Sequence, residues 1–425
     1  MTTEITTTDH GVLAADTTGV LRLPQQILFG AGSLASVPLL VRPHGRRALV
    51  CTDATMAGSP GFATLYAALG AAGIEVSVFA DGVPELPLSV IDDAVRHAQA
   101  ARPDVIIGFG GGSSMDLAKI TALLLHHPGP LDVYYGENLV PGPIGPVVAI
   151  PTTAGTGSEV TPVAVVSDPA RAFKVGVSSP HLVPTYAVVD PELTHGCPAT
   201  VSAHSGADAL AHALESLTAG RRTPSWQQQL PVFVGANRLG RTLALEAVSA
   251  IGSSLRRVVV EPGDGDARTS MAHASLCAAM SFGSAGTHLG HALQYSIGAA
   301  THTSHGLGVG LLLPYVLEVC RATCADDLLV VADVLGVPAA GAPDERITST
   351  IDEVQSIVDD IGIPRTLRDI GVDHADLPAF ASQTSGFARL LQNAPLVADE
   401  ALLLRVLEAA WAGDRSGLRS GSMTR

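Results

Sequence analysis

The stretch Val105-Ile106-Ile107-Gly108-Phe109-Gly110-Gly111-Gly112-Ser113 decides the fold of the first half of the chain. Its apolar run has the length and composition of a buried strand, and a helical pattern follows it through Leu125. Glycines at such a junction place backbone N–H groups at a helix N-terminus, where they can face a phosphate without obstruction by Cβ atoms. Glycine is also common in tight turns, so the cluster alone is equally compatible with a phosphate-binding loop and with a plain turn.

The sequence on either side repeats this alternation of strand and helix. Apolar runs at 47–52 and 74–79 alternate with helical stretches at about 60–72 and 88–101, and a further strand is expected at 147–150. This order predicts a parallel sheet. After Pro191 the pattern becomes Ala/Leu-rich and helical to the C-terminus. We therefore expect an α/β domain with a parallel sheet and dinucleotide-binding loops, followed by an all-α domain. The expected bounds are 1–22 for a flexible extension, 23–195 and 196–425.

Composition excludes several classes of protein. The formal net charge of −15 disfavours a nucleic-acid partner, because such proteins present dense Lys and Arg surfaces. The chain shows neither a signal peptide nor an apolar run of about 18 residues, the length that a membrane span needs. Five scattered cysteines suit free thiols in a reducing compartment. We expect a cytoplasmic protein without a membrane partner.

Two further features fit a nucleotide cofactor. Asp53 closes the first strand of the expected sheet, where a carboxylate can accept hydrogen bonds from a ribose and repel a 2′-phosphate. That position favours NAD over NADP. A competing interpretation is that the Asp53 side chain caps the next helix, because both roles use the same position. The loop Pro151-Thr152-Thr153-Ala154-Gly155-Thr156-Gly157-Ser158-Glu159-Val160-Thr161 is rich in hydroxyl groups and suits phosphate, ribose or amide binding.

Histidines and one aspartate point to a metal site in the second half. Asp208 and His212 lie one helical turn apart on one face of a predicted helix. Two later segments add His288, His291, His302 and His305. Five histidines in a domain that is otherwise poor in polar residues are hard to bury without a shared partner. Oxygen and nitrogen donors of this kind suit Fe(II) or Zn(II) better than Ca(II) or Mg(II), but do not separate iron from zinc.

From about Leu23 to Trp411 the chain resembles the iron-containing (group III) alcohol dehydrogenases. Residues 110–119 are similar to that family's GGGSxxDxAK cradle, residues 151–161 to its PTTAGTGSEVT loop, and residues 206–215 and 291–306 to its metal-binding stretches. The resemblance implies Asp208, His212, His291 and His305 as ligands of one divalent metal, iron before zinc. For the cofactor it implies the following residues: Asp53, Gly110, Gly111, Gly112, Ser113, Asp116, Thr152, Thr153, Thr156 and Lys174.

Three positions depart from that family's pattern. Tyr295 stands where many members have a histidine that relays protons, so the relay is open between Tyr295, His302 and His288. Asn393-Ala394-Pro395 replaces Asn-Pro-Arg, and Pro84-Glu85-Leu86-Pro87 replaces Pro-Asn-Pro-Thr. None of these departures falls on an expected metal ligand.

The expected activity is metal-dependent hydride transfer between a small alcohol or aldehyde and NAD, in a homodimer or larger homo-oligomer. One alternative is a sugar-phosphate cyclase such as 3-dehydroquinate synthase. That reading is disfavoured because the second half has no lysine for an anionic sugar phosphate and carries Asp/His/His/His rather than Glu/His/His. Oxidoreductases that resemble glycerol dehydrogenase or maleylacetate reductase are closer alternatives.

Overall fold

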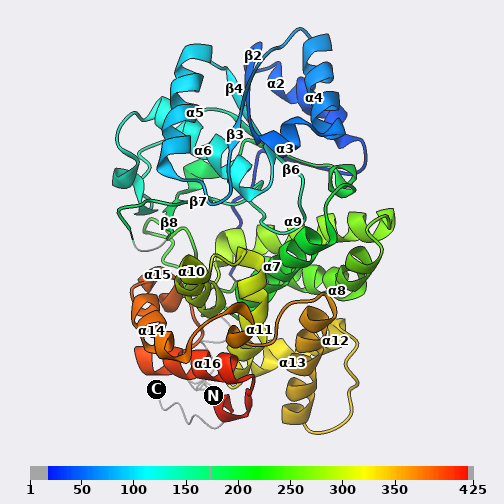
Figure 1. The fold of residues 1–425 in the computed structure, drawn as a ribbon, viewed down its shortest axis with the longest axis vertical. Helices are drawn as coiled ribbons and strands as arrows, with labels where there is room; N and C mark the ends of the chain where they lie inside the picture. The colour runs from blue at the N-terminus through cyan, green and yellow to red at the C-terminus, as the bar shows by residue number, and fades with distance from the viewer. Residues whose placement is uncertain (1–17, 172–173, 420–425) are drawn as a thin grey trace, which may run out of the picture.

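The computed structural model describes residues 18–171 and 174–419, so most of the expected N-terminal extension lies outside the described residues. The chain forms a sheet with helices on both faces, followed by an all-helical half, and the two halves lie end to end (Figure 1). The predicted fold class is therefore confirmed.

The first half is built on a six-stranded sheet in which all paired strands are parallel. Its strands, in spatial order, are β1 (Gln26–Phe29), β9 (Tyr186–Val189), β6 (Val147–Pro151), β4 (Val105–Gly110), β2 (Arg47–Asp53) and β3 (Glu75–Gly82). The two central strands β4 and β6 are buried along their whole length, as a parallel sheet covered on both faces requires.

Helices cover both faces of this sheet. They are α2 (Val37–Val41), α3 (Ala54–Ala57), α4 (Pro60–Ala71), α5 (Leu88–Ala101) and α6 (Gly112–His126). One face packs against α5 and α6, and the other packs against α2 and α4. A small second sheet contains β5 (Gly136–Glu137), β8 (Val175–Ser178) and β7 (Val163–Val166). It lies at the end of the first half that is nearest to the helical half.

The second half is helical throughout. It contains α7 (Ala199–Thr218), α8 (Arg238–Val260), α9 (Gly265–Ala285), α10 (Leu289–Thr301), α11 (His305–Cys320), α12 (Ala325–Val334), α13 (Pro343–Asp360), α14 (Leu377–Ser385), α15 (Ala388–Gln392) and α16 (Glu400–Ala412). In this half α7 and α11 lie at the centre and contribute many of the core residues.

Small residues allow α7 and α11 to approach each other closely. A Cβ atom on Gly306 would overlap the carbonyl oxygen of His204, and one on Gly310 would lie 2.8 Å from the Cβ atom of Ala207. Gly306 and Gly310 are one turn apart, so they form one smooth face of α11. This face fixes the position of the first residue of α11, His305, against α7.

The start of the described chain is tied to the helical half. The backbone N–H of Arg22 donates to Ser284, and its guanidinium donates to the carbonyl of Val232 at 2.6 Å.

All five cysteines are free, as the sequence suggested. No helix in the described ranges is long and apolar enough to cross a membrane.

We predict that Gly306→Ala destabilises the fold by about 1–3 kcal/mol or more, because the backbone carbonyl of His204 leaves no room for the added methyl group. Gly70→Ala is the matched control: Gly70 lies in α4 with open space around it, so alanine should stabilise by up to about 1 kcal/mol. Urea unfolding of the three proteins measures both effects. Equal stability of Gly306→Ala and wild type would contradict the close packing of α7 and α11.

Candidate metal centre

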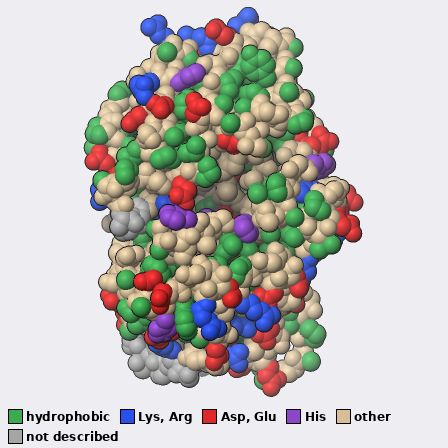
Figure 2. Space-filling model, viewed as in Figure 1, with side chains coloured by type: hydrophobic (Ala, Val, Ile, Leu, Met, Phe, Trp, Pro, Cys, Tyr) green, Lys and Arg blue, Asp and Glu red, His purple; other side chains and the backbone are tan. Residues whose placement is uncertain are grey.

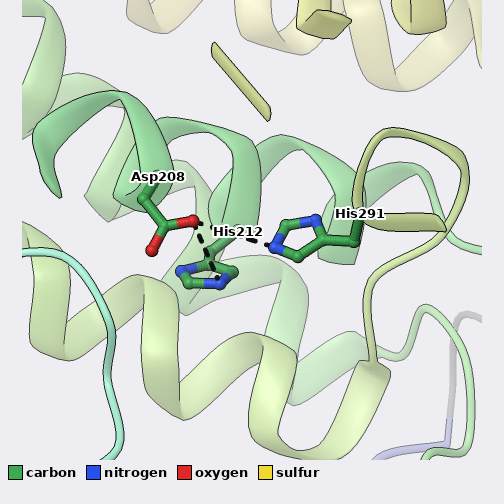
Figure 3. A group of neighbouring side chains, drawn as sticks. All are labelled: Asp208, His212 and His291. Atoms are coloured by element: carbon green, nitrogen blue, oxygen red, sulfur yellow. Dashed lines mark ion pairs between the residues drawn. The ribbon is translucent and has the colours of Figure 1, made fainter. Parts of the chain in front are cut away.

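Four side chains from three helices meet at one point beside the cavity between the two halves. Asp208 and His212 lie on α7, His291 on α10 and His305 at the start of α11. The Nε2 atoms of His212, His291 and His305 lie 3.6, 3.8 and 3.6 Å from the Oδ1 atom of Asp208. Figure 3 shows Asp208, His212 and His291 pointing toward one another. The structure thus brings together all four residues that the sequence suggested as metal ligands.

The burial of these groups fits a bound cation. Asp208, His212 and His291 are each at most 5% exposed, while the His305 side chain is 33% exposed. Asp208 Oδ1 and His291 Nε2 are buried and have no hydrogen-bond partner among the described residues. Unpaired buried polar atoms are costly, and a metal ion between them would remove that cost. Donors bound at about 2.1 Å in a tetrahedron are about 3.4 Å apart, close to the distances of the three Nε2 atoms from Asp208 Oδ1. The donor atoms of Asp208, His212 and His291 all lie within 4.8 Å of one another, and His305 joins this group through its distance to Asp208.

The hydrogen bonds of two histidines fix which ring nitrogen is free. Nδ1 of His212 lies 3.1 Å from the carbonyl oxygen of Gly155, which can only accept a hydrogen bond. Nδ1 of His291 lies 2.7 Å from the Oε2 atom of Glu215. Each Nδ1 therefore carries the proton, and each Nε2 keeps its lone pair toward Asp208.

Electrostatics agrees with this arrangement. Burial lowers the pKa of His212 and of His305 well below the usual histidine value, and the charge of His291 acts in the same direction. Burial also raises the pKa of Asp208 to about 7. Histidine binds a divalent metal as the neutral imidazole, and a metal ion next to Asp208 would offset the burial that raises the pKa of its carboxyl group.

Glu215 is a functional candidate that sequence reasoning missed. Its side chain is 0% exposed and accepts from the backbone N–H of His288 at 2.9 Å as well as from His291. Burial alone would raise its pKa, but the charges of His288 and His291 and these hydrogen bonds lower it to about 2. The spacing in the sequence could have indicated Glu215, because it follows Asp208 by seven residues and so lies on the same face of α7.

Seven of the ten cofactor candidates line the same cavity as the expected metal ligands, and this cavity has a volume of about 490 Å³. The lining includes these residues from the sequence analysis: Gly111, Gly112, Ser113, Asp116, Thr153, Thr156, Lys174, Asp208, His212, His291, Tyr295 and His305. In Figure 2 the molecular surface is hollowed at mid-height, between the two halves. The glycine cluster ends β4 and begins α6, and Gly110 has a φ of 146°, a conformation that favours glycine.

Two of the expected cofactor residues have clear structural contacts. Asp116 accepts from the Ser158 hydroxyl at 2.5 Å and from the Val165 N–H at 2.9 Å, so its carboxylate holds the 151–161 loop against α6. Thr152 does not line the cavity, and its N–H donates to the carbonyl of Gly110 at 3.0 Å. Nearby, the buried Lys119 ammonium donates to the carbonyls of Thr161 and Val163.

Asp53 caps a helix, one of the two uses that the sequence left open. Its Oδ1 atom accepts from the N–H groups of Thr55 and Met56 and caps α3. Its Oδ2 atom faces the glycine cluster, 3.7 Å from where a Cβ atom of Gly110 would lie. The cap uses one oxygen and leaves the other on the side of the glycine cluster.

The three relay candidates have different surroundings. Tyr295 lines the cavity, and its ring stacks on that of His305 with 5.9 Å between centroids. His302 lines a smaller neighbouring cavity, at the end of α10. His288 is 0% exposed, bonds to the Thr218 hydroxyl and does not line the cavity.

Comparison with known proteins identifies the family. The model of the iron-containing alcohol dehydrogenases matches residues 24–191, and that of the C-terminal part of the same family matches residues 202–411. The chain is 33% identical over 389 residues to sulfoacetaldehyde reductase from Bilophila wadsworthia, covering 91% of this chain and 97% of the relative. It is 34% identical over 381 residues to long-chain-alcohol dehydrogenase 1 from Geobacillus thermodenitrificans, covering 89% and 92%.

A solved structure agrees with these relatives. The crystal structure of a 1,3-propanediol oxidoreductase superposes with a TM-score of 0.87 at 28% identity, covering 93% of this chain and 100% of the other. Both halves of the chain are therefore accounted for by one family. The protein is an oxidoreductase that acts on alcohols and belongs to the iron-containing alcohol dehydrogenase family.

Proposed function

We propose that this protein transfers a hydride between a small alcohol or aldehyde and NAD, with one divalent metal, Fe(II), held by Asp208, His212, His291 and His305. The observation that carries the proposal is the convergence of three Nε2 atoms on Asp208 Oδ1 in the cavity that also contains the glycine cluster. The family name supports iron, and the donor set also accepts Zn(II).

A metal and a nicotinamide in this cavity would together supply polarisation of the substrate oxygen and a hydride acceptor. The chain's own residues do the rest. The first N–H groups of α6 and the hydroxyls of Thr153 and Thr156 bind and orient the cofactor's polar groups. Phe282 and Val163 make part of the wall apolar and limit the access of water.

The proton relay is proposed at Tyr295. Of the three candidates it lines the same cavity as the expected ligands, and its stacking on His305 holds the ring in place. Its hydroxyl can hold the proton that the substrate oxygen loses or gains. His288, which bonds to Thr218 and packs against Glu215, is better suited to supporting the ligands.

The first test removes single ligands. Asp208→Ala and His305→Ala should each lower the amount of bound metal and the NAD-linked turnover by more than about 100-fold. The reason is that losing a metal ligand weakens metal binding more than losing a residue that only contacts a ligand. Plasma emission spectrometry measures the bound metal. His181→Ala, which removes an exposed histidine of the first half, should change neither quantity. Protein reconstituted separately with Fe(II) and Zn(II) distinguishes the two metals. Unchanged metal content and turnover in both ligand variants would refute the site.

Glu215→Gln tests the support behind His291. The amide oxygen can still accept from Nδ1, but the negative charge that raises the basicity of the imidazole is lost. We expect about 10- to 100-fold weaker metal binding with Asp208 and the other ligands intact. Competition with a coloured chelator measures the affinity, and thermal unfolding of the metal-free proteins reports any general loss of stability. Equal affinities would leave Glu215 with a packing role only.

Asp53→Asn tests the cofactor assignment. Asparagine keeps an oxygen that can cap α3 but loses the charge that repels a 2′-phosphate. The preference in kcat/KM for NAD over NADP should fall by about 10-fold, which is the discrimination expected from the loss of one repulsive charge contact. Stability should stay close to that of wild type, whereas Asp53→Ala should lose about 1 kcal/mol with the cap. An unchanged cofactor preference would show that Asp53 acts only as a cap.

A further inference from the structure

A second cavity of about 640 Å³ adjoins the one that contains the expected metal ligands. The two share six lining residues, which are Val163, Val165, Lys174, Phe233, Tyr295 and Arg389. A molecule that reacts in the first cavity can therefore extend into the second. The charges that line the second cavity determine what kind of group that extension can be.

Those charges are mainly positive. The charged residues of its lining are Arg171, Lys174, Arg222, Arg389 and Glu137. Four cations and one carboxylate thus surround one cavity in a chain whose formal net charge is −15. The one carboxylate accepts a hydrogen bond from the backbone N–H of Val232. A cavity with this excess of positive charge raises the local concentration of anions.

Arg389 is the cation best placed to contact a substrate. It lines both cavities, and its guanidinium lies 4.8 Å from the centre of the Phe233 ring. No described residue accepts a hydrogen bond from its side chain or forms an ion pair with it. Lys174 differs, because it pairs with Glu85 at 3.0 Å. Arg389 therefore presents a planar set of N–H donors, held flat by Phe233, to whatever enters the cavity.

Hydrogen bonds anchor the helix that carries Arg389 to the part of the chain that carries the metal ligands. Asn393, directly after α15, donates from its side chain to the carbonyls of Ala285 and Thr287 at 3.1 Å each. Its own carbonyl accepts from the N–H of Gly220, two residues after the end of α7. The helix that carries Arg389 is thus bonded to the segments next to α7 and α10, which carry Asp208, His212 and His291.

We propose that the substrate is anionic: a short aliphatic alcohol or aldehyde whose far end is a carboxylate or sulfonate bound by Arg389. The proposal rests on the hydride-transfer function proposed above. In the oxidative direction the carbinol C–H gives its hydride to NAD, the hydroxyl proton is released, and the carbonyl compound and NADH result. The anionic group is unchanged, and its bidentate hydrogen bonds to Arg389 orient the reacting carbon toward the metal ligands.

Pairs of substrates that differ only in charge test this proposal. Hydroxy acids of increasing chain length are each compared with the corresponding primary amide, and hydroxyalkyl sulfonates with the corresponding sulfonamides, by NADH absorbance. Wild type should prefer the anion of the best pair by about 10- to 100-fold in kcat/KM, the range of one charge-assisted contact. Whether the carboxylate or the sulfonate series reaches the higher value identifies the anionic group.

Arg389→Gln should remove this preference by raising KM for the anion about 10- to 100-fold, while kcat/KM for the neutral partner changes by less than about threefold. Arg389→Lys should keep part of the preference because it keeps the charge. Arg42→Gln, an exposed arginine at the end of α2 and remote from both cavities, is the matched control. The neutral substrate reports in the same assay whether each variant is folded.

The outcomes separate the two proposals. Turnover of neutral alcohols with no preference for their anionic partners would overturn the anionic substrate and leave the hydride-transfer function standing. An equal loss for anion and amide in Arg389→Gln would also overturn it. Absence of NAD-linked turnover with every alcohol and aldehyde, in protein loaded with Fe(II) or Zn(II), would overturn the proposed function, and the inference with it.

Discussion

The arrangement of the candidate site depends on the contact between α7 and α11. At Gly306 the backbone of α11 lies so close to the carbonyl of His204 that no side chain fits between them. Because α7 carries Asp208 and His212 and α11 begins with His305, this contact sets the distance between donors that are about a hundred residues apart in the chain. The 3.6 Å separation of His305 Nε2 and Asp208 Oδ1 follows from helix packing rather than from any local motif.

Much of the fold could be predicted from sequence because its signals are local. The strand at Val105–Gly110 and the helix at Leu88–Ala101 occur where apolar runs and helical periodicity placed them. The pairing of Asp208 with His212 could also be predicted, since a spacing of four residues fixes two side chains on one helix face. Choosing His291 and His305 from the remaining histidines needed the family resemblance, because those choices depend on how three helices cross.

The contacts that sequence reasoning missed are those between distant segments. Glu215 lay within a stretch already singled out, but its bonds to His291 and to the backbone at His288 appear only when α7 and α10 are packed together. No motif or spacing in the sequence marked Arg389 as a functional residue. Its importance comes from a five-residue helix near the C-terminus that packs against Phe233 and faces the cavity. The contacts by which the Asp116 carboxylate holds the 151–161 loop in place were also missed.

The hydrogen bonds of Asn393 have a consequence for selectivity. They join α15 to the segments beside α7 and α10, so the backbone that carries Arg389 is anchored to the part of the chain that carries the donors around Asp208. This anchoring limits how far Arg389 can shift toward a substrate of the wrong length. Under the proposed substrate class, the enzyme would discriminate between homologous acids by the number of methylene groups. A change in the turn at Asn393-Ala394-Pro395 would then shift the preferred chain length without altering any residue that contacts the substrate.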